Sequence, residues 1–286
     1  MFEIVSENKF FKGKDIAFEN IKQHAHLVRT IKVIDKETGE KYVARFNTEG
    51  YEDTVEKEYG SLKHINEYID DFYLNIIYSD KDILVTKYFE SKNLIDINEE
   101  EFNDKEGFVA KLKGRLDELH RLPAYRPDGE MSWYETYLDL YNKIVLADPE
   151  NIFTLEEKEM LNKTLEKYTD YLKNVDEVFL QGDVNWPNII YTEGGEEAYI
   201  IDYELSCSGD KLYDYVWLVD RDDSFITKEF LKYEELKNFK NSGLYLLYSL
   251  IPKGRWIVSQ YYKHGMYQDE DIKIMKDMIA KLGERV

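Results

Sequence analysis

Residues 179–190, Phe-Leu-Gln-Gly-Asp-Val-Asn-Trp-Pro-Asn-Ile-Ile, and residues 198–204, Ala-Tyr-Ile-Ile-Asp-Tyr-Glu, carry the pattern that decides the fold. One apolar strand ends at Asp183, the loop after it carries Asn188, and a second apolar strand ends at Asp202. We expect these three oxygen-bearing side chains to converge. Such a set suits phosphoryl transfer, because the protein has to position a hydroxyl near a metal-bound triphosphate and does little covalent chemistry itself.

The pattern assigns a role to each of the three side chains. Asp183 would accept the hydroxyl proton, while Asn188 and Asp202 would hold Mg²⁺, a hard cation that prefers oxygen ligands and nucleotide phosphates. The order Asp, four residues, Asn, then an apolar strand ending in Asp is typical of a kinase catalytic loop and its metal-binding Asp. A purely structural reading stays open, since acids at strand ends also cap helices and turns.

The surrounding motifs carry a family resemblance. Residues 182–188, 201–204 and 209–214 resemble the choline/ethanolamine kinase and aminoglycoside phosphotransferase superfamily, whose pattern reads roughly H-x-D-x-x-x-x-N, I-D-[FW]-E and N-D-P-x-[WY]-D. Glu204 makes the motif most similar to that of bacterial choline kinases. The resemblance implies an α+β, bilobal, protein-kinase-like fold, with Mg²⁺ as cofactor and ATP as co-substrate.

Composition excludes several classes of protein. The 286 residues suffice for one large or two moderate domains, and the net charge of −20 offers no basic surface for nucleic acid or for an anionic membrane. A single cysteine, Cys207, permits no intramolecular disulfide, and the first residues lack the features of a signal peptide. We therefore expect a cytoplasmic protein, monomeric or homodimeric, without nucleic-acid or membrane partners.

Residues 1–90 are predicted to form a nucleotide-binding lobe with an antiparallel sheet and one helix. Strands at 30–34 and 42–46 flank a polar turn, and strands at 72–78 and 82–89 form a second pair. Between the two pairs, residues 53–56 read as a capping box that opens a helix. Its apolar positions at helical spacing are Val55, Tyr59, Leu62 and Ile65.

The resemblance also places nucleotide-binding residues in this lobe. Arg45 stands where a basic residue contacts the phosphates, and Glu58 lies where the helix would pair with it. Tyr88 and Phe89, in the connection between lobes, would lie near the adenine ring. The alternatives are a surface ion pair of little energetic value and a simple edge strand.

Residues 91–286 are predicted to form a mainly helical lobe that carries catalysis and acceptor binding. A buried stripe runs along 109–119, a second helix begins at Ser132, and a capping box at 154–157 opens a third. In choline kinases, aromatic faces and an acid hold a quaternary ammonium. The positions that match most nearly are Glu204, Trp217, Asp220, Asp222 and Trp256, although aromatic residues at helical spacing also suit an ordinary core.

The sequence favours an ATP-dependent phosphotransferase acting on a small cationic alcohol, choline or a related amino alcohol. Two departures from the family pattern keep a non-catalytic nucleotide- or cation-binding protein open as an alternative. Gln181 replaces the usual His, and residues 23–29 lack the glycines of a phosphate-covering loop. An aminoglycoside phosphotransferase is the other alternative, because an acidic lobe also suits amino sugars.

Overall fold

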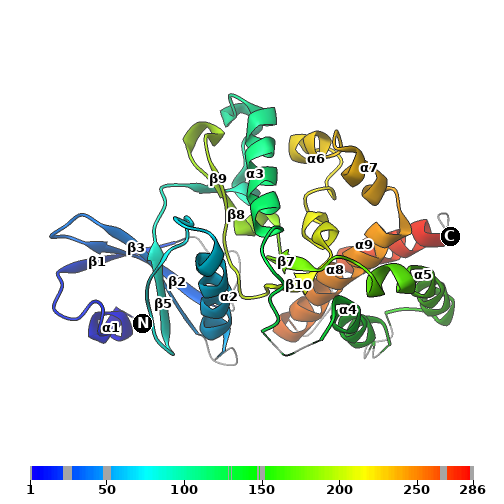
Figure 1. Cartoon of the computed structure of the whole chain (residues 1–286), viewed down its shortest axis with the longest axis horizontal. Helices are drawn as coiled ribbons and strands as arrows, with labels where there is room; N and C mark the ends of the chain where they lie inside the picture. Colours follow the sequence, from blue (N-terminus) through cyan, green and yellow to red (C-terminus); the bar gives the residue numbers. More distant parts are fainter. Residues whose placement is uncertain are drawn as a thin grey trace. The chain divides into compact units, whose positions relative to one another are not determined.

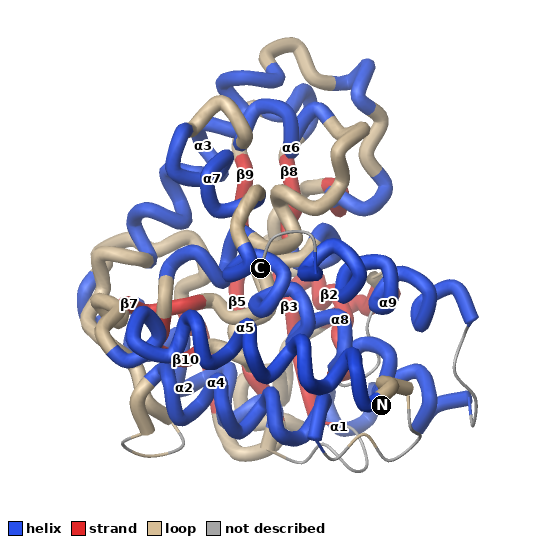
Figure 2. The backbone as a smooth tube through the Cα atoms, turned by 90° about the vertical axis from the view of Figure 1, so that its right-hand side faces the viewer, coloured by secondary structure: helices blue, strands red, loops and turns tan. Residues whose placement is uncertain are grey.

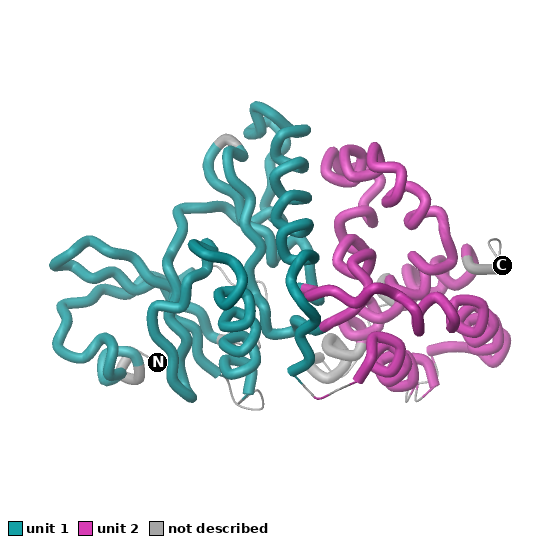
Figure 3. The backbone as a smooth tube through the Cα atoms, viewed as in Figure 1, with its two compact units in different colours: residues 1–127, 181–207 teal, residues 128–180, 208–286 magenta. Residues whose placement is uncertain are grey.

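The chain divides into two compact units, each built from two separate stretches of sequence. The computed structural model describes residues 2–21, 28–47, 53–127, 129, 131–146, 148, 152–264 and 269–283. Unit 1 comprises residues 1–127 and 181–207, and unit 2 comprises residues 128–180 and 208–286 (Figure 3). The fold is α+β, with an antiparallel sheet in the amino-terminal region and a mainly helical carboxy-terminal part.

A five-stranded antiparallel sheet forms the amino-terminal part of unit 1 (Figure 1). Its order is β1-β2-β3-β5-β4, with bounds Ile16–Asn20, Val28–Asp35, Lys41–Asn47, Ile83–Lys87 and Ile76–Ser79. Both predicted strand pairs are confirmed, since β2 pairs with β3 and β4 pairs with β5. Asp80 closes the second turn, because its Oδ1 accepts hydrogen bonds from the backbone N–H groups of Asp82 and Ile83.

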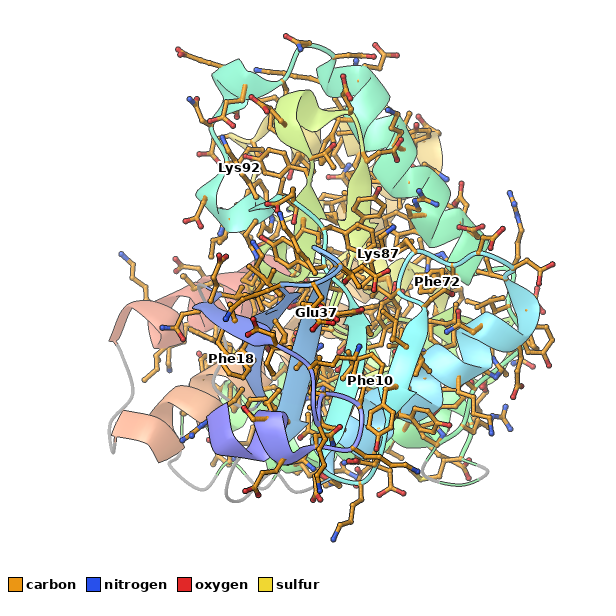
Figure 4. All side chains as sticks on the ribbon, turned by 90° about the vertical axis from the view of Figure 1, so that its left-hand side faces the viewer. Phe10, Phe18, Glu37, Phe72, Lys87 and Lys92 are labelled. Atoms are coloured by element: carbon orange, nitrogen blue, oxygen red, sulfur yellow. The ribbon has the colours of Figure 1, made fainter. Side chains whose placement is uncertain are left out.

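The two faces of this sheet serve different purposes, because side chains alternate along each strand. One face is covered by helix α1 (Phe2–Glu7), which was not predicted, and by the turn after it. The core on this side consists of Val5, Phe11, Ile31, Val33, Tyr42, Ala44, Phe46, Ile83 and Val85. Phe10 and Phe18, labelled in Figure 4, pack against it. On β3, Val43 and Arg45 alternate with the core residues and therefore face the other side.

Helix α2 (Thr54–Tyr68) packs against the sheet and corrects two details of the prediction. The capping box is wrong: Asp53 makes no side-chain cap, and Asn47 Oδ1 at the end of β3 accepts a 2.8 Å hydrogen bond from the Val55 N–H instead. Tyr59 is not a core position but is 36% exposed, whereas Glu58 is only 2% exposed. Glu58 is buried because it forms an ion pair with Arg45, so the buried face of the helix includes this charged residue and leaves out Tyr59.

The remainder of unit 1 joins distant parts of the sequence. Strands β6 (Lys92–Asn93), β8 (Ile189–Tyr191) and β9 (Ala198–Ile200) form a three-stranded antiparallel sheet in which β8 is central. Helix α3 (Lys105–Leu119) packs on β9. The predicted apolar stripe of this helix is confirmed, with Phe108, Val109, Leu112, Leu116 and Leu119 buried.

Unit 2 is mainly helical, as predicted (Figure 2). Its helices are α4 (Trp133–Tyr141), α5 (Leu155–Lys173), α6 (Phe225–Phe230), α7 (Glu234–Lys240), α8 (Gly243–His264) and α9 (Asp269–Gly283). Capping boxes at Ser132 and Thr154 open α4 and α5. A two-stranded sheet pairs β7 (Val178–Leu180) with β10 (Cys207–Gly209).

A buried polar contact ties the aromatic core of unit 2 together. Trp133 Nε1 donates to the Tyr248 hydroxyl at 3.0 Å, and that hydroxyl donates to Asp210 Oδ2 at 2.9 Å. Tyr171 donates to the same oxygen at 2.7 Å, while Asp210 Oδ1 caps the following turn by accepting from the Leu212 N–H. These bonds satisfy the Asp210 carboxylate and give it a structural role.

The compact units do not divide the chain at residue 91. The segment 91–127 and the strands β8 and β9 belong to unit 1, because they pack with one another and are not separate from the amino-terminal residues. The functional lobes at 1–90 and 91–286 therefore stay a prediction. Within the described ranges, no helix combines the length and apolar character that a membrane span requires.

Candidate active site

The turn that carries Asp183 is fixed by the glycine before it. After β7 ends at Leu180, Gly182 adopts φ +84, a left-handed conformation that favours glycine. A Cβ atom at this position would collide with the backbone carbonyl of Leu205. The close approach of the two segments thus requires glycine, and it sets the direction in which Asp183 leaves the strand.

Two amides of the same loop hold the Asp183 carboxylate. Asn185 Nδ2 donates to Asp183 Oδ2 at 2.8 Å, and Asn188 Nδ2 donates to the same oxygen at 3.1 Å. Asn188 Nδ2 also donates to the Asp183 carbonyl at 3.0 Å, which turns the oxygen of its amide group away from Asp183. Asn188 is 7% exposed, so this orientation is held by packing as well.

Asp202 lies two residues after the end of β9 and is a site residue other than glycine with an unusual backbone. Its φ is +69, a conformation that a residue other than glycine adopts only where its surroundings impose it. Two contacts impose it here: the Ile201 N–H donates to the Asn188 carbonyl at 2.8 Å, and Gln181 Nε2 donates to the Asp202 carbonyl at 2.5 Å. The segments of Asn188 and Asp202 are therefore tied together.

Gln181 links the two halves of the site. Its Nε2 donates to the carbonyls of Ile201 and Asp202, and its Oε1 accepts a 2.8 Å hydrogen bond from the Asp183 N–H. Because an amide carries both donor and acceptor, Gln181 makes connections in both directions. The side chain is fully buried. The residue that departs from the family pattern thus connects the Asp183 turn to the Asp202 turn.

Arg45 joins the sheet and helix α2 to Asp202. Its guanidinium contacts Glu58 through one terminal nitrogen and Asp202 Oδ1 at 2.6 Å through the other. Burial alone would lower the pKa of Arg45, but the Asp202 and Glu58 carboxylates outweigh it and raise the pKa. Burial raises the pKa of Glu58 to about 7, against the opposing charge of Arg45. Arg45 is thus the positive charge at the centre of a cluster of acidic side chains that includes Glu58 and Asp202.

Glu204 completes this acidic group. Burial raises its pKa to about 8, and the negative charge of Asp202 adds to the effect. Within the described part of the chain, Glu204 Oε2 and Glu58 Oε2 are buried oxygens without a hydrogen-bond partner. A carboxylate oxygen buried in this way is stabilised by a bound cation.

A pocket within unit 1 brings most of these residues to one surface. Its lining includes Arg45, Glu58, Asn188, Asp202 and Glu204. The lining is otherwise mostly apolar, with several polar side chains, and comprises Ile21, Thr30, Val43, Leu62, Leu74, Thr86, Lys87, Tyr88, Phe89, Ser91, Asn93, Pro187, Ile190 and Ile201. An apolar pocket with a few convergent polar groups is the usual form of a small-molecule site. Tyr88 and Phe89, predicted to lie near a nucleotide base, are among its residues.

The donor set suits a magnesium ion bound together with a ligand. Among the described residues, no three His, Cys, Asp or Glu side chains are grouped to hold a metal by themselves. Magnesium seldom needs such a cage, because it binds one or two carboxylates and completes its shell with water and substrate phosphates. The oxygens of Asn188 and Asp202, beside the partnerless Glu204 oxygen, fit this mode of binding.

The other predicted acceptor residues lie in unit 2. Asp220 is engaged within the fold: Lys253 Nζ lies 2.8 Å from its Oδ1, and the Tyr245 hydroxyl donates to the same oxygen at 2.6 Å. The Lys253 ammonium also lies 5.9 Å from the Trp217 ring centre. By contrast, the Asp222 side chain is 80% exposed and Trp256 is 51% exposed.

Sequence reasoning missed several polar residues of the pocket, among them Asn93, and it left one loop untested. Asn93 lines the pocket, and its Nδ2 donates to the Pro187 carbonyl at 2.5 Å, next to Asn188. Asn93 also caps the turn that follows it by accepting from the Ile95 N–H, and an Asn just before a turn is the one sequence signal that could have drawn attention to it. Of the glycine-free loop at 23–29, residues 23–27 lie outside the described residues.

Known proteins share this fold. Aminoglycoside phosphotransferase APH(4)-Ia superimposes with a TM-score of 0.72 at 12% identity, over 99% of this chain and 97% of that one. Plasmodium vivax ethanolamine kinase gives a TM-score of 0.62 at 16% identity, over 95% and 84%. The macrolide 2′-phosphotransferase from Brachybacterium faecium gives 0.63 at 11% identity, over 93% of both chains.

The sequence itself identifies the family. None of the curated proteins matches the chain. The profile of the phosphotransferase enzyme family matches residues 23–233, which is most of the chain and includes both the Asp183 and the Asp202 segments. The chain therefore belongs to the phosphotransferase enzyme family.

Proposed function

We propose that this phosphotransferase moves the γ-phosphate of ATP to the hydroxyl of a small cationic alcohol, choline or a related amino alcohol. The observation that carries the proposal is the connected arrangement of Asp183, Asn188 and Asp202. Asn188 donates to the Asp183 carboxylate, and the Ile201 N–H donates to the Asn188 carbonyl. A base and two oxygen ligands beside an apolar pocket are what phosphoryl transfer requires.

Asp183 acts as the base in this proposal. Its carboxylate accepts the proton of the acceptor hydroxyl while that oxygen attacks the γ-phosphorus, and the bond from phosphorus to the leaving ADP oxygen breaks. The amides of Asn185 and Asn188 orient the carboxylate through its Oδ2 atom. Because the amides hold one oxygen, the rotation of the carboxylate about its Cβ–Cγ bond is restricted before the acceptor arrives.

Asn188 and Asp202 would hold Mg²⁺, which, when bound, neutralises charge on the phosphate oxygens. Arg45 contacts the phosphates in this assignment, and Glu58 orients its guanidinium. Arg45 gives up its contact with Asp202 to do so, since one guanidinium edge serves either the carboxylate or a phosphate. Arginine suits this exchange, because its planar group binds phosphate in a bidentate fashion.

The nucleotide occupies the pocket of unit 1 in this proposal, with Tyr88 and Phe89 beside the base. A thermostable variant of APH(4)-Ia, which superimposes with a TM-score of 0.71, has been crystallised with ADP and hygromycin B. The likeness in fold supports use of a nucleotide by this chain. ATP is the co-substrate that the cytoplasm supplies, and the single cysteine is consistent with that reducing compartment.

A cationic acceptor is supported by charge. The chain carries a net charge of −20, and Glu204 lines the pocket with an oxygen that has no hydrogen-bond partner and that a bound cation would stabilise. The likeness to an ethanolamine kinase favours an amino alcohol, and the likeness to APH(4)-Ia favours an aminoglycoside as the second candidate. Trp217, Asp222 and Trp256 are the proposed acceptor contacts in unit 2. For Asp220, binding the acceptor requires displacement of Lys253.

An ADP-release assay tests the proposal. Purified protein with Mg²⁺ and ATP is offered choline, ethanolamine, thiamine, kanamycin and hygromycin B in turn, with Asp183→Ala as the control. Stimulation by choline or ethanolamine supports the first proposal, and stimulation by kanamycin or hygromycin B alone replaces it with the second. If no acceptor stimulates ADP release while ADP still binds, the protein is a non-catalytic nucleotide-binding member of the family.

A further inference from the structure

The hydroxyl of Tyr73 makes three hydrogen bonds at the end of strand β9. It donates to the Ile200 carbonyl at 2.6 Å and accepts from the Ile200 N–H at 3.1 Å. It also lies 2.8 Å from the Tyr203 hydroxyl, which is the donor in that contact because the one proton of Tyr73 goes to Ile200. A single side-chain oxygen is thus fully used at the strand end.

The position of these bonds follows from the sheet. Strand β9 lies at the edge of the sheet β6-β8-β9, so alternate backbone groups have no strand partner on its outer side. The Ile201 N–H points inward and donates to Asn188 of the neighbouring segment. The Ile200 N–H and carbonyl therefore point outward, and the Tyr73 hydroxyl takes the place of a fourth strand at this residue.

Ile200 and Tyr203 flank the left-handed turn that presents Asp202. The turn is constrained on its inner side by Gln181 and on its outer side by Tyr73. Tyr203 is also tied to helix α2, since its N–H donates to Glu58 Oε1 at 3.5 Å. Gln181, Tyr73 and Tyr203 thus fix the backbone on both sides of Asp202 without lining the pocket themselves, while Asp202 does line it.

We infer that Tyr73 is a positioning residue for the metal-binding carboxylate, acting through the end of β9. This inference rests on the proposed function, in which Asp202 is a metal ligand. Side chains that orient metal ligands through a second layer of hydrogen bonds typically change metal affinity or activity by about 10- to 100-fold when they are removed. The hydroxyl of Tyr73 stands in that position relative to Asp202.

The decisive variant is Tyr73→Phe. It keeps the ring, which packs 4.9 Å from Tyr199 and 4.3 Å from Phe72 between ring centres and lies 5.3 Å from the Arg115 guanidinium. Only the oxygen is lost. Calorimetric titration with ADP, with and without Mg²⁺, gives the factor by which the metal increases ADP affinity, and this readout needs no acceptor and no turnover.

We expect Tyr73→Phe to reduce that Mg²⁺-dependent factor by about tenfold while the affinity for metal-free ADP stays within about twofold. In the kinase assay, kcat falls by about 10- to 100-fold with little change in KM for ATP. A general loss of structure would weaken ADP binding in both conditions. Tyr78→Phe is the matched control, because its hydroxyl bonds to Asp80 in the same unit, and it should leave both titrations unchanged.

Tyr203→Phe provides a second, graded test if Tyr73→Phe does not fold. It removes one donor and leaves both bonds to Ile200, so the Mg²⁺-dependent factor should fall by only about two- to fivefold. If Tyr73→Phe folds and Mg²⁺ increases its ADP affinity as much as in the wild-type protein, the inference is overturned. If Tyr73→Phe does not fold, the same result in Tyr203→Phe overturns it. If Mg²⁺ does not increase ADP affinity in the wild-type protein, the proposed function fails as well.

Discussion

Arg45 contacts Asp202 through a 2.6 Å ion pair, although 157 positions separate the two residues in the sequence. The same guanidinium contacts Glu58, so one side chain connects the sheet, helix α2 and the turn after β9. Arginine can make both contacts because its terminal nitrogens diverge from one planar group, whereas a lysine ammonium is a single point. This bridge forms the basis for the first prediction.

Arg45→Ala should destabilise the protein by about 3 kcal/mol, because it leaves the buried Glu58 carboxylate and the partly buried Asp202 carboxylate without their positive partner. Arg45→Lys should retain part of this stability. Urea unfolding at pH 7 measures both, and ADP titration follows the loss of phosphate contacts. Arg29→Lys, at an exposed position of β2, is the control. If Arg45→Lys is as stable as the wild-type protein, stability does not require that one side chain contact both Glu58 and Asp202.

Asp183→Asn should lower kcat by about 10²- to 10⁴-fold, because the amide cannot accept the hydroxyl proton. Its similar shape should leave the loop in place, so ADP affinity stays within about twofold of the wild-type value. Steady-state kinetics with the best acceptor, together with calorimetry, separates the two effects. A variant that keeps more than about a tenth of the wild-type kcat is incompatible with Asp183 as the base.

Gln181→Met should disturb both halves of the site at once. The substitution preserves the approximate volume but leaves the Ile201 and Asp202 carbonyls and the Asp183 N–H without their partner. Each unsatisfied buried group costs about 1 to 3 kcal/mol, so we expect a clear fall in melting temperature as well as in kcat. Wild-type stability and turnover in this variant would show that the bridge is dispensable.

Asp220→Asn should reveal a pH-dependent contribution to stability in unit 2. Burial by itself would raise the pKa of Asp220, but the charge of Lys253 and the hydrogen bonds from Lys253 and Tyr245 lower it below its ordinary value. A carboxyl whose pKa is lower in the folded state stabilises the protein above its unfolded pKa of about 4, and this stability is lost as pH falls through the folded pKa.

We therefore expect Asp220→Asn to lower the free energy of unfolding by about 2 to 3 kcal/mol between pH 5 and pH 7. The difference from the wild-type protein should shrink as the pH falls below about 4. Urea unfolding across this pH range measures the difference. Asp223→Asn removes an exposed carboxylate nearby and should show no such cost. A difference that persists unchanged at low pH would rule out the ion pair with Lys253 as its origin.

Local pattern predicted most elements of the fold because their physical causes are local. The hairpin of β2 and β3, the stripe of α3 and the capping box of α5 each depend on residues a few positions apart. The start of α2 was misread, since its cap comes from Asn47 at the end of β3 and not from the neighbouring Asp53. When the capping side chain comes from outside the helix, the sequence of the helix itself does not indicate it.

The site was predictable in part for the same reason. The spacing of Asp183 and Asn188 encodes a loop whose hydrogen bonds are local. The double contact of Arg45 and the bridge made by Gln181 join segments that lie far apart in the sequence or on opposite sides of a turn. The competition of Lys253 for Asp220 is also a tertiary contact, and no periodicity in the sequence indicates it.

The close approach of Gly182 to the Leu205 carbonyl has a consequence for engineering. Replacing glycine by alanine is a common way to make an enzyme more heat-resistant, because it restricts the unfolded chain. At position 182 the added methyl group would instead push apart the two segments that hold the reacting groups. A mutant library aimed at a new acceptor can therefore vary the proposed acceptor contacts Trp217, Asp222 and Trp256, but it should keep Gly182 constant.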